Sequence, residues 1–499
     1  MVREQKSLVL VTVDCLRADH CGFNGYSRPT TPFLDSLAAE SFVVPTAVIA
    51  GAPTYFSFPA ILAARMPLAL GRDVIGLAPG ERTLATTLHE AGYATAAFSA
   101  ANPYISQYFG YEQGFEVFKD FLDFEAPPDA TASEVWTSAA SSTRGRINQS
   151  LSHLAQSAGL GRVYDDLYFQ YCARIAARPV KRIDALRRFP TSQVIVDHAI
   201  QWLTSVKERP FFLWLHLMDP HSPYYPSAES FRELTGKELS PSRARYLNAY
   251  WNRSDLIPSR LGAKKDAVVE LYDAGIRMAD SQVARFIGHL QQENLWESCA
   301  LVLTADHGEE FLEHAHRYHA PLSLSDEIAR VPLLIRTPGF AKKSVPKTPF
   351  SHLHLAPTLL EILDVPAPAS FKGRSLWRNL QQGARWDEPA VTECTYGCTN
   401  PFRMEGHLAP RLISVRDAGH KLVLRIQPGA IEELYDLTTT GKEQQPLPAT
   451  SEPEVRARML RVAWNHVADT AREIDLRLRL KARLRDVRVE LEHRCSQVS

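Results

Sequence analysis

The sequence contains little cysteine and no hydrophobic run long enough to cross a membrane. Its 499 residues include 7 cysteines, which are scattered and odd in number. The pairs closest in sequence, Cys15 with Cys21 and Cys394 with Cys398, lack the spacing of a zinc site or a disulfide framework. The apolar run at residues 7–13 is too short to span a bilayer, and no small-residue cleavage pattern follows it. We therefore expect a protein of the reducing cytoplasm without stable membrane insertion.

An excess of charge of either sign is also absent. Lys+Arg and Asp+Glu number 56 each, which gives a formal net charge of +0. This balance gives no electrostatic reason to expect a nucleic-acid partner or an anionic membrane surface. A hydrophobic content of 45% and a charged content of 22% are ordinary for a globular protein. The length is sufficient for one large domain and a smaller one.

What the sequence does contain is an alternation of apolar, β-rich runs with helical patterns. The predicted strands are residues 7–13, 93–99, 210–218, 300–305 and 330–336. Helical patterns at 83–92, 192–207 and 271–292 lie between them. Continuous apolar strands suit a sheet that is buried on both faces. The alternation predicts the α/β class, with a large, doubly wound and mostly parallel sheet.

This pattern is not uniform along the chain, and its changes suggest the domain organisation. We predict a catalytic domain at 1–385, with a helical insertion at about 121–190. Shorter β-like runs at 386–450 predict a small C-terminal α+β subdomain with an antiparallel sheet. Residues 451–499 form a predicted helical tail, in which apolar residues recur at helical spacing from Leu480 to Leu491. The tail either packs on its own domain or joins two copies into a homo-oligomer.

Polar side chains follow three of the predicted strands. They are Asp14 after the first strand, Asp219 with His221 after the third, and Asp306 with His307 after the fourth. In open α/β sheets ligands bind beyond the carboxyl ends of the strands, so these groups are expected to converge. Carboxylates with imidazole nitrogens suit a divalent metal ion, and Mn, Zn, Ca and Mg all remain candidates.

The segment 51–65 provides a candidate nucleophile. It follows a β-like run, and Pro59 suits the first position of a helix that continues to Arg65. Ser57 would then lie beside the helix N-terminus, where the dipole favours an ionised nucleophile; the alternative is that Ser57 only caps the helix. A nearby cation would lower the pKa of the Ser57 hydroxyl. Thr54 is a second candidate, for which the loop must bend further toward the metal.

These motifs, taken in order, resemble the alkaline phosphatase/sulfatase superfamily, and within it the sulfatase-like hydrolases. The matching segments are Asp14–His20 with Pro29–Pro32, Thr83–Asn102, Met218–Tyr224, Asp306–Phe311, Arg330–Pro332, Ser351–Leu360, Phe371–Leu376 and Glu433–Leu437. The resemblance covers nearly the whole chain except roughly 121–190, 227–265 and the last thirty residues.

The resemblance implies a role for each matching residue. It implies that Asp14, Asp306 and His307 hold the metal and that Ser57 is the nucleophile. His221 and His319 take catalytic positions that contact the ester or its leaving group. Asn102 and His216 take substrate-binding positions, Asn102 standing where related sulfatases place a lysine. Asp219 is implied as a further metal ligand, which with His216 would hold a second ion, as in two-metal members.

The sequence departs from the sulfatase pattern at several positions. Ile61 stands where formylglycine sulfatases need an arginine, and Cys15 stands where they usually carry a second metal-binding aspartate. The lysines expected near Asn102 and His319 are absent. Because an unmodified serine suits phosphoryl transfer, we expect a metal-dependent hydrolase of small anionic esters, namely phosphate mono- or diesters. The alternatives are a sulfatase, a transferase that passes the group to an alcohol, and a binding protein without turnover.

Overall fold

The structure is a computed structural model of the chain. It describes residues 6–71, 74–123, 160–171, 180–206, 209–339, 345–403, 409–426, 431–439 and 441–496, together with the single residues 151, 157 and 406. Most of the predicted insertion at 121–190 lies outside these residues. Its described part includes the helix α6 (Gly161–Gln170) and a 3-10 turn at Ile183–Leu186.

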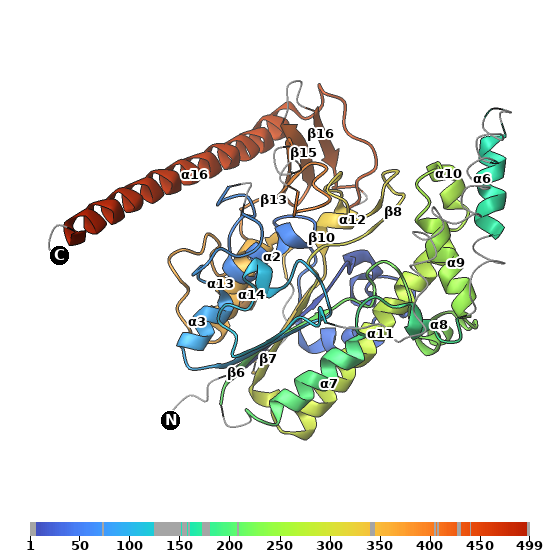
Figure 1. Cartoon of the computed structure of the whole chain (residues 1–499), viewed down its shortest axis with the longest axis horizontal. Helices are drawn as coiled ribbons and strands as arrows, with labels where there is room; N and C mark the ends of the chain where they lie inside the picture. Colours follow the sequence, from blue (N-terminus) through green and yellow to red (C-terminus); the bar gives the residue numbers. More distant parts are fainter. Residues whose placement is uncertain are drawn as a thin grey trace.

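A seven-stranded sheet forms the centre of the molecule (Figure 1). Its strands, in spatial order, are β2 (Phe42–Val43), β11 (Leu333–Arg336), β7 (Cys299–Thr304), β1 (Ser7–Val13), β6 (Phe211–Leu217), β4 (Ala94–Ser99) and β5 (Val117–Lys119). The five strands from β7 to β5 run parallel, whereas β11 is antiparallel to β7 and β2 is antiparallel to β11. The predicted α/β class with a mostly parallel sheet is confirmed.

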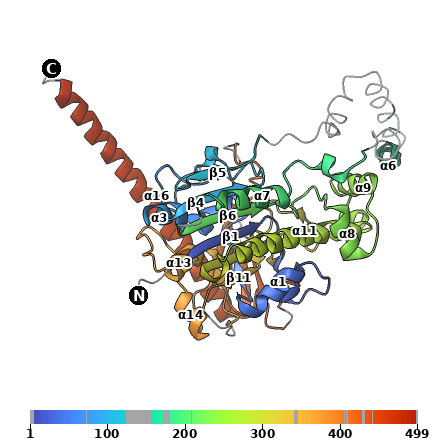
Figure 2. The same ribbon diagram turned by 90° about the horizontal axis from the view of Figure 1, so that it is seen from below.

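The central strands carry apolar residues on both faces because helices cover the sheet on both sides. All residues of β1, β6, β7 and β4 are buried. On one side the long helix α11 (Lys265–Gln292) contacts α1, α7, α8 and α9, which span Pro32–Leu37, Ser192–Leu203, Ala228–Thr235 and Pro241–Trp251. On the other side α2 (Thr54–Ala63) contacts α3 (Leu84–Glu90) and α13 (Leu355–Ile362). Figures 1 and 2 show these two groups of helices.

Short elements complete the main domain around the carboxyl ends of the strands. Further helices among the described residues are α10 (Pro258–Gly262), α12 (Asp326–Ala329) and α14 (Trp377–Gln382). The short strands are β3 (Ala47–Val48), β10 (Arg330–Val331) and β12 (Phe350–Ser351) in one small sheet, and β8 (Glu310–Phe311) with β9 (Arg317–Tyr318) in another.

The C-terminal part forms a separate antiparallel sheet and one long helix. The strands β13 (Ala390–Thr395), β14 (Arg411–Arg416), β15 (His420–Ile426) and β16 (Ile431–Asp436) pair in sequence order. The helix α16 (Pro453–Ser496) packs its first turns on this sheet, where Met459 and Ala463 join the buried core. Further along α16, Thr470 is buried and Glu473 pairs with Lys372, and beyond these residues the helix extends away from the body of the molecule (Figures 1 and 2). A role of the tail in self-association stays a prediction.

A helix that spans a bilayer must be both long and strongly apolar. Among the helices of the described residues, none is both long enough and apolar enough to cross a membrane.

Candidate active site

The central residues of the candidate site follow two neighbouring strands, β1 and β7. Asp14 directly follows β1, and Asp306 follows β7 after one residue, with His307 next. Ligand atoms of these three side chains lie within 4.8 Å of one another, and all three residues are fully buried. The structure therefore brings together the three residues for which the resemblance implied metal binding, because β1 and β7 run parallel and end at the same edge.

The electrostatics of this cluster favour a cation between the carboxylates. Burial raises the pKa of the Asp306 carboxyl, and the nearby Asp14 raises it further. For Asp14 burial acts in the same direction, but His221, His216 and His307 outweigh it and hold the pKa well below its usual value. Oδ2 of Asp306 is buried and has no hydrogen-bond partner in the described structure. Two carboxylates this close need a positive charge to remain ionised together.

His307 is oriented so that one of its ring nitrogens can bind the same cation. Its Nδ1 lies 2.9 Å from the carbonyl oxygen of Gly308, an acceptor that fixes the proton on Nδ1. Nε2 therefore presents its lone pair to the cluster, 3.4 Å from Asp306 Oδ2 and 3.8 Å from Asp14 Oδ1. A backbone acceptor behind a ligating imidazole is the usual arrangement in metal sites. The donor set of two carboxylates and one imidazole thus fits a divalent metal ion.

Asn102 and His216 lie behind Asp14, where they contact its carboxylate. Asn102 follows β4, and its side-chain amide donates to Asp14 Oδ2 at 2.9 Å. His216 lies within β6, with Nε2 at 3.3 Å from the same oxygen and Nδ1 at 2.9 Å from Thr12 Oγ1. Both residues are buried, at 2% and 1% exposure. These contacts suit a role in orienting Asp14, and the substrate contact that the resemblance implied for both residues stays a prediction.

We expect Asn102→Ala to weaken metal binding about 10- to 100-fold, the effect typical of residues that orient a ligand. The variant frees one oxygen of Asp14 from its donor while leaving the three ligands in place. Isothermal titration of the metal-stripped protein with Zn²⁺ or Mn²⁺ measures the change. Asn24→Ala, which removes an amide outside the cluster, is the matched control. An unchanged Kd for Asn102→Ala contradicts the orienting role.

Asp219 does not join the cluster, and its assignment as a metal ligand is corrected by the structure. Its carboxylate accepts from Arg187 at 3.3 Å and from the backbone N–H of Ser192 at the start of α7. The residue is 2% exposed. Asp219 follows a parallel strand as Asp14 does, but an arginine and a helix N-terminus from another segment satisfy its charge.

The helix α2 presents Thr54, and not Ser57, to the cluster. It begins at Thr54, so Pro59 lies inside it and the prediction of a helix start at Pro59 is wrong. Thr54 Oγ1 lies 3.1 Å from His307 Nε2. The Ser57 hydroxyl donates to the main-chain carbonyl of Asp306 at 2.6 Å and so fastens the helix to the β7 loop. The first N–H groups of a helix have no intrahelical acceptor, so Thr54 stands where an anion is favoured.

His221 and His319 lie side by side next to the cluster, and their surroundings shift their pKa values in opposite directions. Their ring centres are 5.1 Å apart. Burial lowers the pKa of His221, which favours the neutral form of its imidazole. Burial acts on His319 in the same sense, but Glu309, Asp14 and Asp306 outweigh it and raise its pKa to about 9. His319 is thus a proton donor at neutral pH, and His221 is an acceptor.

Glu309, which the sequence did not single out, holds His319 in place. Its Oε1 lies 3.2 Å from Nδ1 of His319, and its Oε2 accepts from the Tyr224 hydroxyl at 3.0 Å. The carboxylate is fully buried. Glu309 belongs to the Asp306–Phe311 motif, but its contact with His319 depends on how the following loop folds back, which no sequence spacing reveals.

Comparison with known proteins agrees with this site. The family model "Sulfatase" matches residues 6–365, which contain every residue of the cluster. The chain belongs to the sulfatase family. A second family model, described as "N-sulphoglucosamine sulphohydrolase, C-terminal", matches residues 303–466. The resemblance stated from the motifs is confirmed, whereas the ester hydrolysis that it implies stays a prediction.

The curated relatives of this sulfatase-family chain are distant. An uncharacterized sulfatase, YidJ of Escherichia coli (strain K12), is 27% identical over 179 residues, covering 34% of this chain and 35% of that protein. Arylsulfatase K of Rattus norvegicus is 29% identical over 205 residues, covering 36% of this chain and 35% of its own. These matches therefore span about a third of those relatives. An arylsulfatase of Clostridium perfringens is 26% identical over 416 residues, covering 78% and 82%.

Solved structures share the fold over almost the whole chain. A 2-O GAG sulfatase aligns with a TM-score of 0.64 at 16% identity, covering 95% of this chain and 93% of its own. A phosphonate monoester hydrolase from Silicibacter pomeroyi aligns with a TM-score of 0.63 at 18% identity, covering 94% and 96%. At this level of identity the likeness concerns the fold alone.

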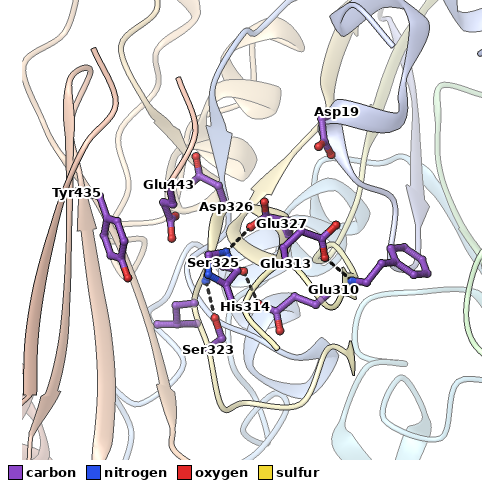
Figure 3. A network of polar contacts seen from close by, with 12 residues as sticks. Asp19, Glu310, Glu313, His314, Ser323, Ser325, Asp326, Glu327, Tyr435 and Glu443 are labelled. Atoms are coloured by element: carbon purple, nitrogen blue, oxygen red, sulfur yellow. Dashed lines mark hydrogen bonds and ion pairs between the residues drawn. The ribbon is translucent and has the colours of Figure 1, made fainter. Parts of the chain in front are cut away.

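The sulfatase-family core is fastened to the C-terminal sheet by a polar network around the loop that carries His319. Figure 3 shows His314 beside Glu327, at 3.0 Å, and Ser325 donating to Glu310 at 2.7 Å. Next to them Asp326 of α12 is paired with two cations of the C-terminal sheet. These are Arg416 of β14 and the fully buried Lys421 of β15, which also contacts Glu443. The C-terminal sheet thus supports the segment that positions His319 and Glu309.

Proposed function

We propose that this protein is a metal-dependent hydrolase of small phosphate esters that uses unmodified Thr54 as its nucleophile. The observation that carries the proposal is the position of the Thr54 hydroxyl. It projects from the first residue of a wholly buried helix and lies 3.1 Å from the inward-facing nitrogen of His307. The reaction is the one expected from the sequence, but the nucleophile is Thr54 instead of Ser57.

Asp14, Asp306 and His307 are the residues that would hold the ion, and the sulfatase family typically binds a divalent metal. When bound, such an ion lowers the pKa of an adjacent hydroxyl and offsets negative charge on the transferred group. Asn102 and His216 keep Asp14 in its ligating orientation. At the start of α2 the N–H groups of Phe56 and Ser57 donate to the Pro53 carbonyl, which leaves those of Thr54 and Tyr55 for the non-bridging oxygens of the ester.

Residues of this chain supply the groups that form one P–O bond and break the other. The Thr54 hydroxyl loses its proton to solvent, and its oxygen attacks phosphorus and forms the new P–O bond, while the bond from phosphorus to the ester oxygen breaks. His319, held protonated by Glu309, gives its proton to the departing oxygen. Water then attacks the phosphothreonine, and His319, now neutral, accepts the proton of the water. The bond from phosphorus to Thr54 breaks, phosphate leaves, and the Thr54 oxygen takes up a proton from solvent.

The residue type at the nucleophile position separates phosphate from sulfate chemistry. A formylglycine hydrate expels sulfate by elimination, which requires an aldehyde carbon. The β-carbon of threonine carries a methyl group, so its oxidation would give a ketone instead. A phosphothreonine needs no such route, because water attacks at phosphorus.

The second candidate is hydrolysis of sulfate esters, which the comparisons favour. The matching family model and the arylsulfatase relatives both carry that activity in their names. In this case Thr54 would have to transfer the sulfuryl group to water without an aldehyde intermediate.

A matched set of substrates decides between the two candidates. Aryl phosphate monoesters, aryl phosphodiesters and aryl sulfates with one common leaving group are supplied to metal-stripped protein reloaded with Mn²⁺, Zn²⁺, Ca²⁺ or Mg²⁺. We expect metal-dependent turnover of a phosphate ester, with the sulfate slower by at least about 100-fold in kcat/KM, or about 2.7 kcal/mol in transition-state stabilisation. Preferred turnover of the sulfate establishes the second candidate and overturns the first.

A further inference from the structure

Cys15 occupies a strained position at the centre of the site. Its backbone has φ = 61°, a left-handed conformation that L residues other than glycine rarely adopt. The Tyr272 hydroxyl donates to the Cys15 carbonyl at 2.6 Å and accepts from the Arg17 N–H at 3.0 Å, which holds the turn in this form. A strained residue that its surroundings maintain is a reason to look for a function of its side chain.

The strained turn directs the thiol into the metal cluster. Cys15 Sγ lies 3.1 Å from Asp14 Oδ1 and 3.4 Å from Nδ1 of His319, and the side chain is fully buried. Sγ is within 4.8 Å of ligand atoms of His307 and His319, and in a second grouping of those of Asp14 and His221. The thiol therefore shares one small volume with the residues already proposed to hold the ion.

The chemistry of the donor set changes when this sulfur is included. Two carboxylates and one imidazole accept many divalent ions, whereas a thiolate binds borderline-soft Zn²⁺ well and hard Ca²⁺ or Mg²⁺ poorly. We propose that the Cys15 thiolate is a ligand of the metal ion and makes the centre select Zn²⁺ over Ca²⁺ and Mg²⁺. On binding, the sulfur–metal bond forms and the thiol proton passes to solvent.

This inference rests on the metal centre of the proposed function, but not on its nucleophile or its substrate. Its test is therefore a direct measurement of metal binding without turnover. Co²⁺ replaces Zn²⁺ in such sites, and a bond between cobalt and thiolate gives charge-transfer absorption in the near ultraviolet. We expect metal-stripped wild-type protein to develop this band as one equivalent of Co²⁺ binds. Cys15→Ser should lack the band, and Cys21→Ala, which removes another buried thiol, should keep it.

A second measurement compares the affinities of the site for Zn²⁺ and Ca²⁺. We expect Cys15→Ser to weaken Zn²⁺ binding by more than about 100-fold, which is the upper end for residues that only orient ligands. Cys15→Asp should restore ion binding with the opposite preference, so that Ca²⁺ binds more tightly than to wild type. Aspartate tolerates the left-handed conformation better than most residues, so this variant is compatible with the turn.

The outcomes separate this inference from the proposed function. Stoichiometric Co²⁺ binding without the charge-transfer band overturns the role of Cys15 and leaves the hydrolase proposal intact. If the wild-type protein binds Ca²⁺ more tightly than Zn²⁺, the role of Cys15 is likewise overturned and the hydrolase proposal is unaffected. A band that appears in a protein without phosphate-ester turnover supports the Cys15 ligand and counts against the hydrolase. Failure of the wild-type protein to bind any of these ions contradicts both.

Discussion

Thr54→Ala is expected to lower kcat for the preferred ester by at least about 10⁴-fold, because removal of a covalent nucleophile leaves only binding and electrostatic stabilisation. The methyl side chain of alanine fits a position that is already fully enclosed, so the fold and the metal affinity should persist. Steady-state kinetics of the metal-loaded variant measure the loss. Acid quenching of the wild-type reaction, followed by mass spectrometry, should locate the transferred group on the peptide that carries Thr54.

Ser57→Ala is the matched control for this prediction. Ser57 lies on the same helix, and its hydroxyl bonds to the Asp306 carbonyl. We expect the loss of this buried hydrogen bond to cost about 1 kcal/mol of stability and to leave kcat within about tenfold of wild type. Thr54→Ser, which keeps the hydroxyl, should retain most of the activity. Inactivation by Ser57→Ala with an active Thr54→Ala would restore Ser57 as the nucleophile.

We expect that in the Asp306→Asn variant added metal ion no longer raises the catalytic rate or the stability of the fold. In the metal-free protein Asp306 is buried beside Asp14, and both burial and Asp14 raise its pKa. A neutral amide relieves this repulsion, so the stripped variant should be at least as stable as the stripped wild type. Ion at 1,000 times its Kd should stabilise the wild type by about 4 kcal/mol and the variant far less. We also expect kcat to fall by at least about 1,000-fold.

Thermal unfolding with and without chelator measures this effect, and Asp219→Asn is its control. Asp219 also follows a parallel strand, but its carboxylate pairs with Arg187. Asp219→Asn should therefore lower the Tm in all conditions by weakening that buried ion pair, while the rise in Tm on adding metal stays as in wild type. If Asp306→Asn keeps the full metal-induced rise, Asp306 is not a ligand.

The sequence was sufficient to predict which strand ends converge. Continuous apolar runs that end in Asp14 and Asp306 have one simple solution, a buried parallel sheet whose strands end at the same edge. It could not separate these residues from Asp219, because the residue that satisfies Asp219, Arg187, comes from a segment with no recognisable pattern. Likewise the contact of Glu309 with His319 depends on a loop fastened by the C-terminal sheet.

By itself, then, the sequence determined the α/β class, the family and the strand ends that hold the candidate metal site, because hydrophobic periodicity and local motifs are properties of short segments. Only the tertiary structure decided which hydroxyl faces the site. Proline is tolerated inside α2 because this wholly buried helix is stabilised by packing, so the helix starts five residues before Pro59 and presents Thr54. The strained turn that directs Cys15 into the cluster is also imposed from outside its own segment, by Tyr272 of the distant helix α11.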